Sequence, residues 1–135
     1  MHARHFADLV VGQSIVRTFP ITKELIAAYA DVVDDHNPLH TDVEYATPRF
    51  GGIIAHGTLL IGLFSATMCV LLGPGAVART FKCKFRAAVR PGDQVRIELS
   101  ISGLAARIRK VVVEGKAYVG STLVVTTTIE ALCEA

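Results

Sequence analysis

The heptapeptide DDHNPLH, residues 34–40, gathers two carboxylates, two imidazoles and an amide around one proline. Asp35 and His40 lie five positions apart across Pro38, so a turn can bring a carboxylate and an imidazole into one small volume. An imidazole titrates near neutrality and a carboxylate is ionised there, so such a pair can remove a proton from water and return one to a carbon acid. We predict acid–base chemistry for these two residues, with Asn37 fixing the turn or orienting a partner.

A second candidate is the sequence His56-Gly57-Thr58, which opens the most apolar segment of the chain. The first backbone N–H groups of a helix lack intrahelical partners and lie at the positive end of the helix dipole. Glycine has no side chain, so a carbonyl group can approach its N–H closely. The Gly57 N–H is therefore predicted to stabilise an oxygen that becomes negative during a reaction.

Other interpretations of the same residues remain open. A polar loop that only caps a helix would use Asp35 and His40 without any chemistry. A metal site would need His36, His40 and His56 together with Asp35, but Pro38 interrupts the helical spacing of the first two, so no metal is expected. His56 is either a structural residue hydrogen-bonded at a helix start or a catalyst, and together with Asn37 it is also a candidate substrate-binding residue.

Secondary structure follows from the periodicity of apolar residues. Thr22 can cap a helix that fades near Val33, and Ile21 with Ile26 can form a hydrophobic staple around that cap. The expected elements before residue 76 are a strand at 14–18, that helix, a loop at 34–38, a helical turn at 42–46, a mobile lid loop at 49–52, and a buried helix from His56 to Gly73-Pro74-Gly75.

After Gly75 the period changes to two, which is typical of strands. Phe81, Cys83, Phe85 and Ala87 would form the dry face of the first strand, and Lys82, Lys84 and Arg86 a charged face that is either solvated or binds phosphate groups. Further strands are expected at 95–101, 107–119 and 122–131. One antiparallel sheet around one buried helix is the hotdog architecture, an α+β class.

Composition limits the protein class. The 135 residues suit one domain, 1–135, and 51% apolar against 19% charged residues suggests a surface partly covered in an oligomer. The net charge of +2 without a basic run argues against nucleic acid, and the interrupted apolar region Thr58–Leu72 is too short for a membrane span, so a cytoplasmic protein is expected. Cys69, Cys83 and Cys133 are interpreted as reduced structural thiols.

Two segments carry a family resemblance. YADVVDDHNPLHTDVEYA (29–46) and FGGIIAHGTLL (50–60) resemble the MaoC-like dehydratases, or R-specific enoyl-CoA hydratases, whose loop reads G-D-x-N-P-[LI]-H and whose buried helix opens with H-G. The VRPGDQV turn (89–95) and the final strand pair are also similar. Asp34 departs from the pattern, because the family usually has glycine there; it would either raise the proton affinity of Asp35 or point into solvent, and we expect solvent.

The resemblance implies roles for individual residues. Asp35 and His40 would form the hydration dyad, the Gly57 amide would bind the thioester oxygen, and Asn37 would support the loop. Ser65 and Met68 would shape the acyl pocket. The substrate would be a trans-2-enoyl thioester of coenzyme A or of an acyl carrier, hydrated reversibly to the R-3-hydroxyacyl product without metal or organic cofactor, in a homodimer or higher homo-oligomer. Two rivals remain, a hotdog thioesterase and a non-catalytic acyl-binding or stabilising subunit.

Overall fold

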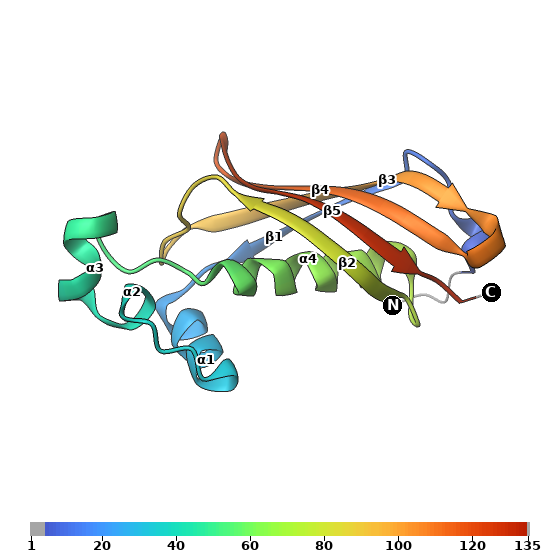
Figure 1. Cartoon of the computed structure of the whole chain (residues 1–135). Coiled ribbons are helices and arrows are strands. Elements are labelled where there is room, and N and C mark those ends of the chain that lie inside the picture. The colour runs from blue at the N-terminus through green and yellow to red at the C-terminus, as the bar shows by residue number, and fades with distance from the viewer. Residues whose placement is uncertain (1–4, 135) are drawn as a thin grey trace.

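The structure, a computed structural model, describes residues 5–134. Its centre is an antiparallel sheet that curves over one long helix, as Figure 1 shows. The strand order is β1-β3-β4-β5-β2, and the sheet contains β1 (Ser14–Pro20), β2 (Val77–Phe85), β3 (Gln94–Ala105), β4 (Lys110–Val119) and β5 (Thr122–Leu132). The hotdog fold and the α+β class expected from the sequence are confirmed.

Helix α4 (Gly57–Leu72) is the buried helix, and it lies along one face of the sheet (Figure 1). Its buried side chains include Phe64, Met68 and Leu72, which belong to the main hydrophobic core. A Cβ atom on Gly115 of β4 would lie 2.7 Å from a Leu99 methyl carbon and 3.0 Å from the Phe64 ring. The missing side chain therefore lets the helix pack closely on the middle of the sheet.

Helix α1 (Lys23–Val33) begins and ends as the sequence indicates. The Thr22 hydroxyl accepts a hydrogen bond from the Leu25 N–H at 3.0 Å, and Ile21 and Ile26 are both buried. The helix ends at Asp34, whose φ of 57° and ψ of 41° are left-handed. The next N–H, that of Asp35, then donates to the Ala30 carbonyl at 3.0 Å, which closes the helix end and starts the polar loop.

Two short helices follow, and both correct the sequence-based expectations. Pro38 does not extend the loop but begins α2 (Pro38–Thr41), because proline suits the first helical position and Asn37 provides the cap, so His40 is helical. Helix α3 (Val43–Phe50) continues beyond the expected turn at 42–46, so Arg49 and Phe50 are not in a loop. The Arg49 Nη1 donates to the Tyr45 carbonyl at 2.7 Å and supports the last turn.

The strands also differ in extent from the prediction. Strand β2 begins at Val77 and stops before Ala87, β3 continues to Ala105, and a 3-10 turn at Ala106–Ile108 takes the start of the expected fourth strand. Phe85 was expected on a dry face, but it is 53% exposed, because its ring lies against the first residue of α4 at the edge of an open pocket. Within residues 5–134, every helix is too short or too polar to cross a membrane.

Candidate active site

His40 lies at the end of the molecule where α1, α2 and α3 gather near the start of α4 (Figure 1). Its Nδ1 is 2.8 Å from the Ile54 carbonyl oxygen. Because a carbonyl can only accept, we assign the proton to Nδ1, which leaves a lone pair on Nε2. The ring is half-buried. The strand-like segment before α4 thus fixes both the orientation and the tautomer of this imidazole.

Asp35 is held in place by the turn that follows α1. One oxygen of its carboxylate, Oδ1, accepts the Asn37 N–H at 3.2 Å, and the Asn37 side-chain oxygen accepts the Leu39 N–H at 3.0 Å. Asn37 therefore supports the loop, because its N–H binds the Asp35 carboxylate and its side-chain oxygen caps α2. This fits the supporting role that the resemblance implies, whereas direct substrate contact by Asn37 stays a prediction.

His56 lies behind the dyad. Its side chain is 1% exposed, its Nε2 donates to the Asp35 carbonyl at 3.0 Å, and its ring stacks on that of His40. The edge of the Tyr29 ring packs against it at a centroid distance of 4.9 Å. The Nδ1 atom is buried without a hydrogen-bond partner among the described residues. His56 is thus placed to hold Asp35 and His40. It does not line the adjacent pocket of the single chain, and its role in substrate binding stays a prediction.

Three side chains converge at this point. One ligand-type atom each of Asp35, His40 and His56 lies within 4.8 Å of the other two. A single water molecule can span a gap of this size and bond to two of these groups at once. The spacing therefore allows the Asp35 carboxylate and the His40 imidazole to act on one water molecule.

Asp35, His40 and His56 also offer oxygen and nitrogen atoms of the kinds that bind metal ions. The planes of the two imidazoles are 26° apart with centroids 3.7 Å apart. Imidazole lone pairs lie in the ring plane, so those of stacked rings lie in two separate, nearly parallel planes, which is a poor geometry for binding one ion. One nitrogen of each ring is also occupied by a carbonyl group. The arrangement fits a hydrogen-bonded dyad better than a metal centre.

A pocket of about 430 Å³ opens beside the dyad. His40 and Gly57 both line it, together with Phe50, Ile54, Ala55, Leu60, Phe85, Arg86, Ala87, Ala88 and Val89. As the first residue of α4, Gly57 has an N–H without an intrahelical acceptor. A Cβ atom at this position would lie 2.8 Å from the Phe85 ring. Because residue 57 is glycine, the Phe85 ring can lie against the start of α4, next to the Gly57 N–H.

Two of the residues expected at the site lie elsewhere. Met68 is buried in the core between α4 and the sheet, and Ser65 is half-buried on the same helix. Neither lines the pocket of the single chain. Their distance follows from the helix itself, because 8 residues of α-helix from Gly57 to Ser65 rise about 12 Å. The pocket mouth is therefore shaped by other side chains, while a deeper role for Ser65 and Met68 stays a prediction.

The polar side chains of the heptapeptide point in different directions. Asp34 points into solvent with 93% of its side chain exposed, as expected. His36 is half-exposed and lies 3.4 Å from the Asp34 carboxylate and 3.7 Å from that of Asp31. It points away from the group formed by Asp35, His40 and His56. Of the five polar residues of the heptapeptide, only Asp35 and His40 thus belong to this group.

Sequence reasoning missed several participants. The Tyr29 hydroxyl lies 2.7 Å from the Thr58 hydroxyl in the first turn of α4. Ile54 contributes its carbonyl to His40, and Phe85 contributes its ring to the pocket. A backbone carbonyl and an aromatic ring at a strand end leave no signal in the sequence that distinguishes them from packing residues.

A known protein family matches most of this chain. Residues 9–125 match the family model described as the MaoC like domain. The chain belongs to the MaoC-like family. Among its relatives, the 3-hydroxybutyryl-CoA dehydratase of Methylorubrum extorquens is 37% identical over 109 residues, covering 78% of this chain and 69% of the relative. The (R)-specific enoyl-CoA hydratase of Rhodospirillum rubrum is 36% identical over 129 residues, covering 85% and 90%.

Solved structures place this MaoC-like chain among the R-hydratases by shape. The (R)-hydratase from A. caviae superimposes with a TM-score of 0.87 at 29% identity, covering 93% of this chain and 98% of that one. The R-hydratase PhaJ1 from Pseudomonas aeruginosa gives a TM-score of 0.89 at 30% identity, covering 96% and 85%. The family resemblance seen in the sequence is thereby confirmed.

Proposed function

We propose that this MaoC-like protein is a hydro-lyase that adds water reversibly to a trans-2-enoyl thioester and forms the R-3-hydroxyacyl thioester. The observation that carries this proposal is the convergence of the Asp35 and His40 side chains within 4.8 Å, next to a pocket that also holds the Gly57 N–H. The names of the relatives support the same reaction class, including both the hydratase and the dehydratase direction.

The reaction uses each group according to its chemistry. One water molecule binds between the Asp35 carboxylate and the His40 Nε2, and the pair removes a proton from it as its oxygen attacks C3 of the enoyl group. The electron pair of the double bond moves toward the thioester carbonyl, whose negative oxygen accepts the Gly57 N–H. The proton held by the pair is then delivered to C2, so that the elements of water are added and the dyad is regenerated.

Crotonyl-CoA provides the test. The purified protein should form 3-hydroxybutyryl-CoA, with the loss of the enoyl thioester absorbance as the readout. Asp35→Asn and His40→Ala should each lower turnover by about 100-fold or more, in the range of general acid–base contributions. His36→Ala is the matched control, because it removes an imidazole from the same heptapeptide that points elsewhere. Release of free coenzyme A and crotonate would instead identify a thioesterase, which the comparisons do not favour.

Other properties are part of the proposal. We expect no metal or organic cofactor, so prolonged dialysis against a chelator should leave the hydration rate unchanged. We also expect a homodimer with its active sites near the subunit contact, which light scattering after size-exclusion chromatography would detect as twice the chain mass. The cytoplasmic location expected from the sequence remains a prediction. An inert homo-oligomer over a wide range of enoyl thioesters would support the non-catalytic alternative.

A further inference from the structure

A second hollow lies apart from the dyad pocket. It is a trough of about 720 Å³ over strand β5, on the face of the sheet that points away from α4. Its floor is made by Thr126 and Thr128, whose short side chains alternate with the inward-facing Thr127. Longer side chains on the neighbouring strands form its walls: Lys82 and Lys84 on β2, and Glu114 and Lys116 on β4.

The walls of this trough carry an excess of positive charge. Four cationic side chains line it, Lys82, Lys84, Arg86 and Lys116, against the single carboxylate of Glu114. The Glu114 carboxylate already accepts the Thr128 hydroxyl at 2.8 Å. None of the four cations has an ion-pair partner within residues 5–134, whereas Arg96 pairs with Glu98 at 3.1 Å. The trough is therefore a cationic surface whose charge the chain itself leaves unbalanced.

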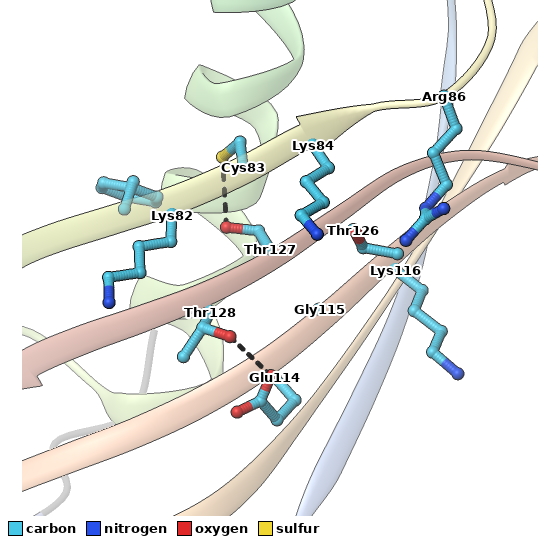
Figure 2. A pocket seen from close by; sticks show the side chains of 11 residues that line it. Lys82, Cys83, Lys84, Arg86, Glu114, Gly115, Lys116, Thr126, Thr127 and Thr128 are labelled. Atoms are coloured by element: carbon cyan, nitrogen blue, oxygen red, sulfur yellow. Dashed lines mark hydrogen bonds between the residues drawn. The ribbon is translucent and has the colours of Figure 1, made fainter.

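Figure 2 shows how these cations are arranged. The side chains of Lys84 and Arg86 extend across β5 toward Thr126, so their charged ends lie above the floor of the trough. The Cys83–Thr127 hydrogen bond, at 3.1 Å, belongs to the opposite face of the same strands. Charged groups and hydroxyl donors therefore share one side of the sheet, an arrangement that suits phosphate oxygens.

Arg86 connects this trough to the dyad pocket, because it lines both. It follows Phe85, the last residue of β2, whose ring covers the start of α4. From Arg86 to Lys82 the strand spans four residues, or about 13 Å. A flexible chain that enters the pocket past the end of β2 can thus continue along the trough on the outer face.

We propose that this trough binds the phosphate groups at the nucleotide end of coenzyme A while the acyl thioester occupies the dyad pocket. The inference rests on the proposed function, which supplies the thioester. The pantetheine arm would pass the end of β2 beside Arg86, and the pyrophosphate and 3′-phosphate would lie among Lys82, Lys84 and Lys116. Lysine ammonium groups act as point charges for phosphate, and the Thr126 hydroxyl adds a neutral donor, since that of Thr128 is donated to Glu114.

A pair of substrates separates this role from catalysis. Crotonyl-CoA carries the phosphates, whereas crotonyl-pantetheine has the same reacting group and arm without them. The variant Lys82→Gln/Lys84→Gln/Lys116→Gln should raise KM for crotonyl-CoA about tenfold, as expected for several exposed charge pairs lost together. Its KM for crotonyl-pantetheine should stay at the wild-type value. In the wild type, added salt should raise KM for crotonyl-CoA only.

The matched control removes the same charge elsewhere on the sheet. The control variant is Arg79→Gln/Arg107→Gln/Lys110→Gln. Arg79 and Lys110 line a different hollow, and Arg107 lies in the 3-10 turn before β4. This variant should leave both KM values unchanged. Equal KM changes in the two triple variants, or equal changes for the two substrates, would overturn the proposed phosphate site.

Two further outcomes are distinguishable. If the wild-type protein hydrates neither substrate, the proposed function is wrong, and so is the phosphate site that rests on it. If the trough variant impairs only a crotonyl thioester on an acyl carrier protein, the trough is a protein-docking surface and the nucleotide proposal is wrong. A loss restricted to crotonyl-CoA supports the phosphate site.

Discussion

The imidazole rings of His40 and His56 stack with their centroids 3.7 Å apart and their planes 26° from parallel. The second ring is fully buried and also donates to the Asp35 carbonyl. One buried side chain therefore contacts both members of the proposed dyad, through a ring face and through a hydrogen bond. Its position immediately before α4 connects the dyad to the start of the buried helix.

Two substitutions of His56 should separate its two contacts. His56→Phe keeps an aromatic face against His40 but removes the hydrogen bond to Asp35, and His56→Asn keeps an N–H donor but removes the stacking. Each should lower kcat by about 10- to 100-fold, the range typical of residues that orient a functional side chain. The pH profile of kcat should also change shape, which a loss of stability alone would not cause. Thermal melts provide the control, and wild-type kcat in both variants would contradict the positioning role.

Gly57→Ala should damage the pocket more than the fold. The new methyl group would lie 2.8 Å from the Phe85 ring, and this half-exposed ring can move to avoid it. We expect a decrease in kcat/KM of about tenfold or more, because the displaced ring obstructs the N–H donor, with little change in Tm. Adding Phe85→Leu to Gly57→Ala gives the methyl group space and should recover part of the activity. If the double variant were no better than Gly57→Ala, the ring would not be the cause.

Asp34→Gly should stabilise the protein. Asp34 has a φ of 57°, a conformation that glycine adopts without the steric cost that a Cβ atom brings. The lost contact with His36 is exposed and contributes little. We expect the free energy of unfolding to rise by about 0.5–1 kcal/mol and the hydration rate to remain at the wild-type value. Asp34→Val is the informative comparison, because a β-branched residue is strained there and should lower the Tm.

Cys133 should be the slowest thiol to react in the folded protein. Burial raises the pKa of this thiol, because the charged thiolate loses its hydration there. A raised pKa means less thiolate at any given pH below it, so alkylation at mildly alkaline pH should be slower than in the denatured chain. Mass spectrometry after timed iodoacetamide treatment measures this rate. Labelling of Cys133 ahead of the half-buried Cys69 would contradict the prediction.

The linkage between this thiol and stability has a defined sign. Its folded-state pKa lies above the unfolded value, so the unfolded chain loses the proton first as pH rises. Cys133 therefore favours the folded state fully below the unfolded pKa, and this contribution decreases in the alkaline range. Cys133→Ala should flatten the alkaline decrease in Tm, although it also removes buried volume.

The sequence by itself determined the hotdog architecture, the Thr22 cap, the solvent-facing Asp34 and the pairing of Asp35 with His40 in one region. These follow from local rules, because hydrophobic periodicity, proline and capping residues act over a few positions. The sequence also indicated that Gly57 lies at the start of the buried helix, since it directly precedes the long apolar run.

Only the tertiary structure decided which groups meet. The stacking of His56 on His40 joins the residue before α4 to helix α2. The Ile54 carbonyl binds the His40 ring, 14 residues away in the sequence. The Phe85 ring comes from β2, which follows α4. The trough over β5 depends in the same way on the register that aligns Lys84 with Thr126. Such contacts arise from the packing of elements distant in the chain, and local residue preferences carry no information about that packing.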